Sequence, residues 1–422
     1  MKQAERIHDL IIIGGGPSGL EMGLAAAEMG LDFVILEKNG IANNIRSWGH
    51  VTLFTPWRMN VSHRGKKAAN LKVISPDAVC TGAEYASEYL KPLSESPGLA
   101  PHIITGAQVV SIGRKGAYKN TLIGDPKRAE LPFRALVDVR SGDGAIQERE
   151  YLSRAVIDAS GGYGNNRWLG AGGIHCPGER ALSSHISYTL EDFSNKNNEL
   201  AGKHLALVGA GYSACTALES FAELVRQGCD LTVSWIVSGD NAQPINLIAD
   251  DPLPYRHELG LLANQLASQS RSQNNHWLRC LPGRSVCGIE KSQQGILVII
   301  EKTDSAARET LVVDHIYAMI GYKPDRSLYE ELQVHECWAT SGPMNLAASL
   351  LAQSGVDCLN VESGGPETLK NPEPDFYIIG AKSYGRHSNY LMERVHDQIQ
   401  IVSDLLAQKL ASTPNKAMAP DS

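Results

Sequence analysis

The chain has 422 residues, enough for about two to three domains, and the 43% that are hydrophobic suffice for large cores. Its 39 basic and 46 acidic side chains give a formal net charge of -7, which argues against nucleic acid or an anionic membrane as the main partner. No apolar run reaches the roughly 20 residues of a membrane span, and residues 1–6 lack the apolar core of a secretory signal. The eight cysteines are irregularly spaced, which suits a reducing compartment, so we expect a cytoplasmic protein.

A glycine-rich turn near the start of the chain joins an apolar stretch to a predicted helix. Residues 10–13 predict a buried strand, and residues 20–29 predict a helix. The spacing G-x-G-x-x-G between them permits a tight turn, close approach of a diphosphate to the backbone, and close packing of helix on strand. The predicted cofactor-binding residues of this turn are Gly14, Gly16, Pro17, Ser18 and Gly19.

An acidic residue follows this turn at the spacing typical of a ribose contact. A second predicted strand, 33–36, ends at Glu37, about 20 residues beyond the glycines, where a carboxylate can accept hydrogen bonds from ribose hydroxyls. We assign Glu37 and the adjacent Lys38 to the same site. The order of strand, turn, helix, strand and acid predicts a bound adenine dinucleotide, and an ordinary tight turn is the alternative.

A similar turn recurs near residue 210. A strand at 206–208 leads into G-x-G-x-x-A, and a helix is expected over 213–227. The next strand, 231–237, has neither an acid at its tip nor an arginine beside it, so the choice between NADH and NADPH stays open, with NADPH favoured. A degenerate turn that keeps only the fold is the alternative. The predicted cofactor-binding residues are Gly209, Gly211, Tyr212, Ser213 and Ala214.

Two such turns make the sequence resemble the two-dinucleotide-binding-domain flavoproteins, and within them the flavin-containing monooxygenase-like branch. Residues 156–161 are similar to the strand and turn where these proteins leave the FAD domain, 314–325 to the A-T-G-Y-x-P return segment, and 375–381 to the last FAD-contacting strand. The resemblance implies an α/β fold with two Rossmann-like dinucleotide-binding domains, the NAD(P)-binding domain nested in the FAD-binding domain. It also implies FAD and NAD(P)H as cofactors.

The domain boundaries follow from these segments. We expect the first part of the FAD-binding domain over 1–190, the NAD(P)-binding domain over 199–320, and the second part of the FAD-binding domain over 321–410, followed by a disordered tail, 411–422. An insertion within the nested domain, 243–283, is predicted to be a lid beside the cofactor site. A plain packing excursion or a homodimer contact is the alternative.

The sequence departs from two branches of the family. Disulfide reductases carry a redox cysteine pair, but this chain has no C-x-x-C and has residues 43–48, N-N-I-R-S-W, where one such pair would lie. The monooxygenase pattern F-x-G-x-x-x-H-x-x-x-W is also incomplete before the second glycine turn. A dithiol relay is therefore not expected, and oxygen activation is supported by architecture more than by signature residues.

Catalytic candidates lie in a segment that, in this architecture, crosses the flavin ring. Residues 48–62 concentrate two tryptophans, a histidine, an arginine and an asparagine. The resemblance implies that Arg58 or Asn60 stabilises a peroxyflavin by preorganised hydrogen bonding, and that Trp48 contacts the cofactor. The alternative is that Phe54 and Trp57 pack in a core and Arg58 only contacts the adenosine diphosphate.

A second candidate cluster precedes the last helix. Tyr384, Arg386 and Asn389 are predicted to orient a polar or anionic substrate, and His387 is predicted to move a proton. A basic loop that only neutralises phosphate is the alternative. The resemblance also implies that Gly380 and Gln398 contact FAD. No metal-ligand spacing is visible among the histidines.

These patterns predict an enzyme that takes hydride from NAD(P)H onto FAD and uses dioxygen, through a peroxyflavin, to oxygenate a small molecule at nitrogen or sulfur. A flavin oxidase or dehydrogenase with a vestigial nicotinamide site is the first alternative. A non-catalytic flavoprotein that reports redox state to a partner is the second.

Overall fold

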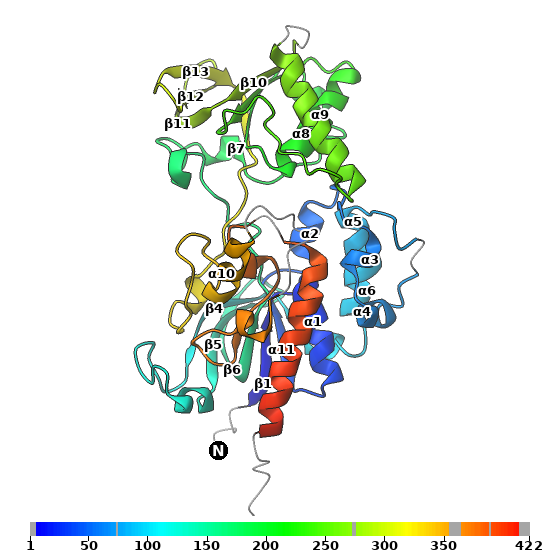
Figure 1. The fold of residues 1–422 in the computed structure, drawn as a ribbon, viewed down its shortest axis with the longest axis vertical. Coiled ribbons are helices and arrows are strands. Elements are labelled where there is room, and N and C mark those ends of the chain that lie inside the picture. The colour runs from blue at the N-terminus through cyan, green and yellow to red at the C-terminus, as the bar shows by residue number, and fades with distance from the viewer. Residues whose placement is uncertain (1–5, 73–74, 272–275, 354–363, 388–389, 413–422) are drawn as a thin grey trace, which may run out of the picture. The chain divides into compact units, whose positions relative to one another are not determined.

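The computed structural model describes residues 6–72, 75–271, 276–353, 364–387 and 390–412. The chain divides into two compact units (Figure 1). Unit 1 comprises Met1–Gly49, Pro56–Gly162 and Lys323–Ser422, and unit 2 comprises His50–Thr55 and Tyr163–Tyr322. Unit 2 is therefore inserted into unit 1 along the sequence. Within the described ranges, no helix is long and apolar enough to cross a membrane.

Unit 1 is built on a seven-stranded sheet with the order β3-β2-β1-β6-β5-β4, in which β15 also pairs with β6. The pairs among β1, β2, β3, β6 and β15 are parallel, whereas β4, β5 and β6 form an antiparallel extension. The strands are β1 (Ile7–Ile13), β2 (Phe33–Glu37), β3 (Ile103–Thr105), β4 (Ala107–Arg114), β5 (Phe133–Arg140), β6 (Ile146–Asp158) and β15 (Phe376–Ile378).

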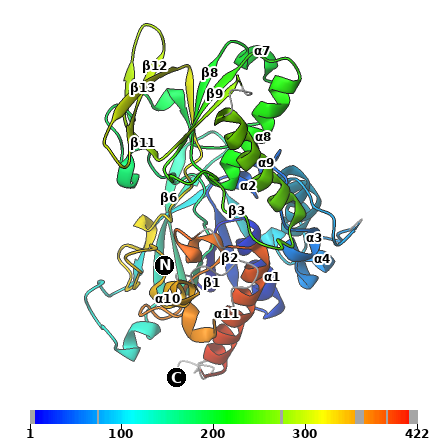
Figure 2. The same cartoon turned by 45° about the horizontal axis from the view of Figure 1, so that its top comes forward.

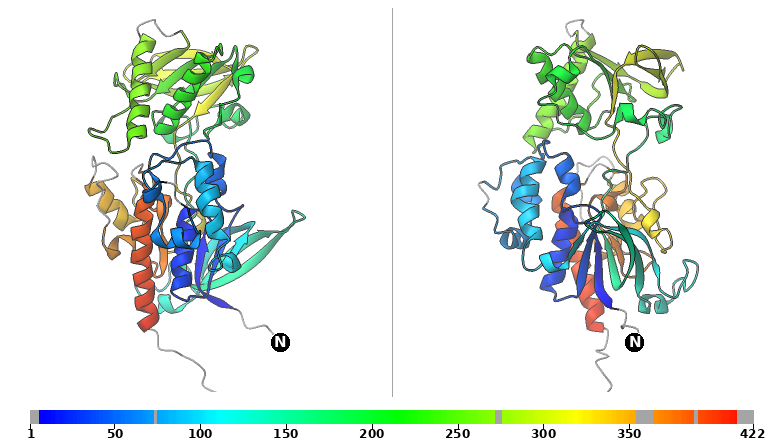
Figure 3. Two further views of the ribbon diagram at one scale, coloured as in Figure 1. Left: turned by 90° about the vertical axis from the view of Figure 1, so that its right-hand side faces the viewer. Right: turned by 180° about the vertical axis from the view of Figure 1, so that it is seen from behind.

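Helices cover the parallel part of this sheet. The two long helices, α1 (Pro17–Glu28) and α11 (Met392–Ser412), lie side by side (Figure 3). A Cβ on Gly23 of α1 would lie only 2.7 Å from Ile35 Cδ1, so this glycine lets the helix approach β2. The remaining helices are α2 (Asn43–Ser47), α3 (Trp57–Asn60), α4 (His63–Ala68), α5 (Gly82–Glu84), the π-helix η1 (Tyr85–Leu90), α6 (Lys91–Ser94) and α10 (Met344–Ala352), with 3₁₀ turns η2 (Ala100–His102), η3 (Pro126–Glu130), η6 (Ser327–Tyr329), η7 (Pro366–Leu369) and η8 (Gly380–Tyr384).

Unit 2 packs a five-stranded parallel sheet, order β10-β9-β8-β14-β7, between helices and a three-stranded antiparallel sheet, β11-β12-β13 (Figure 2). Leu205 and Leu207 of β8 face the helices, while Ala206 and Val208 face the small sheet. This alternation buries both faces of β8, as parallel strands require. The elements are η4 (Ala171–Gly173), η5 (Ser183–His185), β7 (Ile186–Ser187), α7 (Asn197–Leu200), β8 (His204–Val208), α8 (Tyr212–Arg226), β9 (Thr232–Val237), α9 (Pro254–Arg271), β10 (Leu278–Pro282), β11 (Arg284–Lys291), β12 (Ile296–Lys302), β13 (Arg308–Val313) and β14 (His315–Ala318).

The unit boundaries differ from the expected domain boundaries. Residues 163–190 group with unit 2, because β7 pairs with β14 of its parallel sheet. The 243–283 segment holds α9 and also β10, which is an integral strand of the same sheet. The last helix continues to Ser412, and residues 413–422 of the expected tail lie outside the described residues.

A buried charge cluster ties the antiparallel extension of unit 1 to its C-terminal segment. The fully buried Glu373 carboxylate pairs with Arg114, at 2.7 Å, and with Arg128, at 2.8 Å. The backbone N–H of Gln333 also donates to Glu373 Oε2, at 2.8 Å. Burial by itself raises the pKa of Glu373, but hydrogen bonds from Arg128, Gln333 and Arg114 lower it, and the net shift is downward.

Replacing Glu373 by Gln should destabilise the chain by about 3–5 kcal/mol, because two buried guanidinium groups lose their counter-charge. Urea unfolding measures the loss, and the exposed Glu331→Gln is the control. Since the folded pKa is depressed, the stability that Glu373 contributes should be present at neutral pH and lost as pH falls below about 4.3, the ordinary glutamate value. Equal stability of both variants would contradict this role.

Candidate dinucleotide sites

The first glycine turn lies at the carboxyl edge of the parallel strands of unit 1. β1 ends at Ile13, and Gly14 has a φ of +104°, which disfavours any side chain. A Cβ on Gly14 would also lie 2.7 Å from the Ala159 carbonyl oxygen, and one on Gly19 would collide with the Gly14 carbonyl. Backbone geometry and packing therefore require both of these glycines.

Gly16 is glycine for a different reason. Its φ of -87° suits any residue, and no heavy atom lies within 4 Å of the place that its Cβ would take. It is the N-cap of the 12-residue helix α1, where no side chain caps the free backbone N–H groups and Pro17 opens the first turn. A helix N-terminus that presents free donors to open space fits a diphosphate group. The turn is thus shaped for the pyrophosphate of a dinucleotide.

The predicted ribose-binding acid, Glu37, lies against this turn. Glu37 Oε2 accepts a hydrogen bond from Gly15 N at 2.6 Å, and Oε1 accepts one from Asn39 N at 2.8 Å. The carboxylate is half-buried, and the adjacent Lys38 is exposed. The structure therefore brings Glu37 to the glycine turn, as the sequence predicts, and leaves Lys38 facing solvent.

Gly380 and Gln398 lie on the same edge of unit 1. Gly380 follows β15 with a φ of +71°, and a Cβ there would collide with the Ser18 hydroxyl. Gln398 of α11 accepts from Gly380 N at 2.8 Å and donates to Ser383 Oγ at 2.9 Å. Gln398 therefore fixes the turn after β15 against α11, a positioning task that the sequence did not indicate.

A buried ion pair beneath this turn was missed by the sequence analysis. Lys382 Nζ lies 2.6 Å from Asp158 Oδ2, and both side chains are fully buried. Ser160 links the two, since Lys382 donates to its Oγ at 3.0 Å and that hydroxyl donates to Asp158 Oδ1 at 2.6 Å. The pair joins the ends of β6 and β15. The sequence offered only two signals: an acid, Asp158, at the end of one apolar strand, and a lysine, Lys382, four residues after the end of another.

A second buried carboxylate that the sequence analysis missed sits on α1. Glu21 accepts hydrogen bonds from the hydroxyls of Tyr89 and Ser62, the latter at 2.6 Å. His396 Nε2 of α11 lies 3.8 Å from the same carboxylate. Glu21 thus fastens α1, whose N-terminus forms the glycine turn, to η1, the N-cap of α4 and α11.

The predicted catalytic residues Arg58 and Asn60 both lie on the short helix α3. Arg58 is exposed and pairs with Asp77 at 2.7 Å. Asn60 is 1% exposed, and its backbone oxygen accepts from the Tyr85 hydroxyl at 2.8 Å. The structure places Arg58 at the surface and Asn60 in the core of unit 1, so their role at a flavin stays a prediction. Trp48 is half-buried and packs against Gly82, whose Cβ would lie 2.8 Å from its ring.

The predicted substrate residues Tyr384 and Arg386 follow β15, together with His387, which is predicted to move a proton. Tyr384 is buried and stacks edge-on against Tyr390 with ring centroids 5.5 Å apart. Arg386 is exposed and donates from Nε to Ser341 Oγ at 3.2 Å. The half-buried His387 donates its backbone N–H to the Tyr384 oxygen at 3.1 Å. These three share one turn, while Asn389 lies outside the described residues.

The second glycine turn, in unit 2, repeats the design of the first. Gly209 has a φ of +122°, and its Cβ would collide with the Met319 carbonyl. Gly211, by contrast, has a φ of -90° with no atom near its Cβ position, and it is the uncapped N-cap of α8. Trp235 Nε1 donates to Gly209 O at 2.7 Å and fixes the turn. Each unit therefore has an open glycine, Gly16 or Gly211, with free space at its Cβ position, and a constrained glycine, Gly14 or Gly209, with positive φ and a carbonyl close by.

The other residues of the second turn differ in burial. Ala214 is buried, Ser213 is exposed, and Tyr212 packs its ring 5.0 Å from that of Phe54. Phe54 also contacts Tyr255 of α9, at 5.8 Å. The 50–55 segment therefore packs with unit 2, beside its glycine turn.

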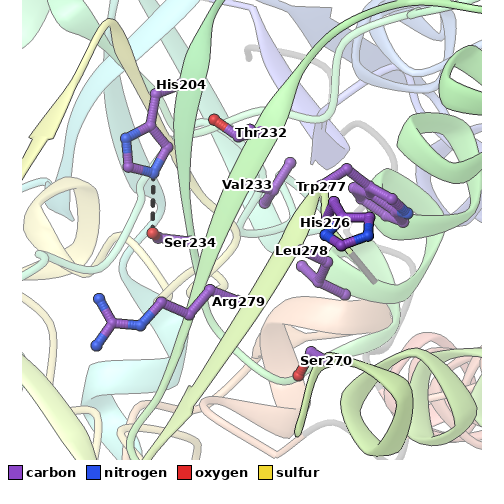
Figure 4. Close-up of a pocket in the computed structure, with 9 residues that line it drawn as sticks. All are labelled: His204, Thr232, Val233, Ser234, Ser270, His276, Trp277, Leu278 and Arg279. Carbon is purple, nitrogen blue, oxygen red and sulfur yellow. Dashed lines mark hydrogen bonds between the residues drawn. The ribbon is translucent and has the colours of Figure 1, made fainter. Parts of the chain in front are cut away.

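A cavity of about 600 Å³ lies elsewhere in unit 2 (Figure 4). His204, Thr232 and Leu278, which begin β8, β9 and β10, line it, and His204 Nε2 lies 2.9 Å from Ser234 Oγ. It is therefore at the amino edge of the sheet, opposite the glycine turn. In the part of the chain that the structure describes, no group of three or more His, Cys, Asp or Glu side chains could hold a metal ion.

Comparisons with known proteins agree with this arrangement. Residues 11–118 match the family model described as pyridine nucleotide-disulphide oxidoreductase. A curated relative, dihydrolipoyl dehydrogenase 2 of Haloarcula marismortui, is 26% identical over 229 residues, 53% of this chain and 42% of the relative. The chain therefore matches less than half of that relative's length.

Solved structures match nearly the whole chain. Bacillithiol disulfide reductase from Bacillus cereus has a TM-score of 0.67 at 17% identity, and the reduced form of ornithine hydroxylase from Pseudomonas aeruginosa has 0.62 at 16%. Each comparison covers 96% of this chain and 100% of the other. These matches show the fold of the chain, which is similar to that of the reductase and of the hydroxylase. The predicted resemblance and the predicted fold class are thereby confirmed.

The open glycines allow a direct test of the two predicted dinucleotide sites. Gly16→Val and Gly211→Val should each leave the thermal stability of the ligand-free protein within about 1 kcal/mol, because the new side chains meet no neighbours. Gly16→Val should abolish FAD retention, and Gly211→Val should weaken NAD(P)H binding at least tenfold. Melting curves and fluorescence titration measure the two effects. Unchanged nucleotide binding in either variant would mean that its turn does not approach a diphosphate.

The buried Asp158–Lys382 ion pair can be tested by substitution. Lys382→Met should cost about 3–5 kcal/mol, because it strands a buried carboxylate, and the double variant Lys382→Met, Asp158→Leu should recover most of that loss. Urea unfolding of the apoprotein provides the measurement. If the double variant is no more stable than the single one, the charge pair is not the source of the loss.

Proposed function

We propose that the chain is a FAD enzyme that takes hydride from NAD(P)H and oxygenates a small molecule at nitrogen or sulfur. When bound, FAD supplies the hydride acceptor and the chemistry toward dioxygen. The protein residues would hold the two nucleotides, orient the substrate and exclude water.

The observation that carries the proposal is the pair of open glycines. Neither a positive φ nor close packing requires glycine at Gly16 or Gly211, and each is the N-cap of a helix that has no side-chain cap. Two diphosphate cradles in one chain support two dinucleotides, and two dinucleotides support electron transfer between them.

The cysteines argue against disulfide chemistry, although the family model bears that name. A thiolate is the nucleophile in thiol–disulfide exchange, and burial raises the pKa of Cys80, Cys176 and Cys215 to about 12. Cys337 differs, since a hydrogen bond from Thr340 lowers its pKa, but its side chain is 3% exposed. The sequence contains no C-x-x-C pair. These features favour an acceptor other than a disulfide.

The likeness to ornithine hydroxylases supports an amine nitrogen as the oxygenated atom. Tyr384 and Arg386 remain proposed substrate residues, and His387 remains the proposed proton carrier, since the three share the turn after β15. An arginine fork would suit a substrate that carries a carboxylate.

The test is anaerobic reduction of the FAD-loaded protein by NADPH and by NADH, followed by rapid mixing with oxygenated buffer with and without amine or thioether compounds. We expect reduction by a nicotinamide nucleotide, a transient near-ultraviolet absorbance during reoxidation, and an oxygenated product when a substrate is present. Formation of hydrogen peroxide alone with every compound would contradict oxygenation.

A flavin oxidase or dehydrogenase is the second candidate, because the tip of β9 carries no ribose-binding acid or arginine. It predicts that neither nicotinamide nucleotide reduces the flavin and that a metabolite does so directly. Turnover of low-molecular-weight disulfides by NAD(P)H would instead support reductase chemistry.

A further inference from the structure

The choice between NADH and NADPH depends on the side chains that lie at the tip of β9, and strand pairing can bring residues there from outside the loop that follows β9. In a doubly wound sheet, the tip of the second strand meets the adenosine ribose, where an acid favours the 2′-hydroxyl and an arginine favours a 2′-phosphate. β9 ends at Val237, and the residues after it are Ser238, Gly239 and Asp240. No arginine follows in that loop.

The structure brings an arginine to this tip from 46 residues farther along the chain (284 minus 238). β10 runs parallel to β9 with Pro282 opposite Val237, so the two strands end together. Gly283 N then donates to Gly239 O at 2.7 Å. Arg284 is the next residue, and it therefore starts at the same edge as the loop after β9.

The turn that precedes Arg284 is fixed. Gly283 has a φ of +62°, and its carbonyl accepts hydrogen bonds from Thr303 N at 3.0 Å and from Thr303 Oγ1 at 3.2 Å. Two strand spacings, about 10 Å, separate the tips of β10 and β8, a span suited to the adenosine half of a dinucleotide whose diphosphate lies at Gly211. Arg284 thus stands where the far end of that half would lie.

The guanidinium group of Arg284 is weakly engaged. Its Nη1 lies 3.3 Å from the carbonyl oxygens of Pro282 and Gly283, which are long hydrogen bonds, and among the described residues it forms no ion pair. The side chain is half-buried. An arginine without a carboxylate partner keeps its planar fork of donors for a phosphate.

Two other charged residues share this edge. Lys302 lies opposite Arg284 in the β11–β12 ladder but pairs with Asp304 at 2.6 Å. Asp240 is exposed, and its Cβ lies 3.4 Å from the Cβ position of Gly283. Its carboxylate would repel a 2′-phosphate and accept from a 2′-hydroxyl, so Asp240 and Arg284 favour opposite cofactors.

We infer that Arg284 binds the 2′-phosphate of NADPH and makes NADPH the preferred nucleotide of unit 2. The inference rests on the proposed use of a nicotinamide nucleotide by this unit. It assigns the specificity residue to the first residue of β11, outside the loop where the sequence pattern places it.

The test uses the full-length, FAD-loaded protein and two probes, adenosine 2′,5′-bisphosphate and adenosine 5′-monophosphate, titrated by calorimetry. The native protein should prefer the bisphosphate. Arg284→Ala should weaken bisphosphate binding by about 10- to 100-fold, the range expected for hydrogen bonds to a charged group, and leave monophosphate binding within about twofold. Arg284→Lys should lie between the two, since it keeps the charge and loses the fork.

The matched control is Arg279→Ala, which removes an exposed arginine near the start of β10, at the amino edge of the same parallel sheet. It should change neither affinity. If Arg284→Ala weakens both probes equally, or if neither probe binds the native protein, the inference is wrong. If Asp240→Ala instead weakens the monophosphate while Arg284→Ala has no effect, the site prefers NADH.

These readouts separate the inference from the proposed function. Arg284-dependent bisphosphate binding in a protein whose flavin NADPH does not reduce would support the nucleotide assignment and overturn the hydride transfer. Reduction of the flavin by NADPH and NADH at equal efficiency, with unchanged bisphosphate affinity in Arg284→Ala, would support the hydride transfer and overturn the assignment of Arg284.

Discussion

Both units depend on the same close crossing of a turn over a neighbouring strand end. At Gly14 and Gly209, positive φ and a nearby carbonyl, that of Ala159 or Met319, leave room for a hydrogen atom only. This crossing aims the following helix so that its N-terminus opens at the carboxyl edge of the sheet. Gly16 and Gly211 then stand at that opening without any internal need for glycine. The contrast separates glycines that the fold requires from glycines that a bound diphosphate would require.

Buried charges supply much of the remaining order in unit 1. Asp158 with Lys382, Glu373 with two arginines, and Glu21 with its hydroxyl partners each join segments that are far apart in the sequence. Such groups are costly to leave unpaired, so they disfavour alternative packings of these segments. Two of the three clusters lie next to the glycine turn or to the turn after β15. They therefore fix the positions of the elements on which a bound flavin would depend.

Sequence reasoning succeeded for local structure. The glycine turns, Glu37 and the class of fold could be predicted because short spacing encodes them, and the structure places Glu37 against its turn. It could not predict contacts between residues that are far apart in the sequence. Lys382 meets Asp158 across 224 residues (382 minus 158), and Arg284 reaches the tip of β9 only because β10 pairs with it. Composition likewise could not show that Arg58 faces solvent beside Asp77 while Asn60 lies in the core.

The central claim is that one chain holds two different dinucleotides, one in each unit. Native mass spectrometry of the full-length protein, with FAD and a nicotinamide nucleotide added together, tests it most directly. The account predicts a complex of one FAD and one nicotinamide nucleotide per chain, with Gly16→Val losing the first and Gly211→Val losing the second. A single nucleotide per chain, or loss of both from either variant, would contradict it.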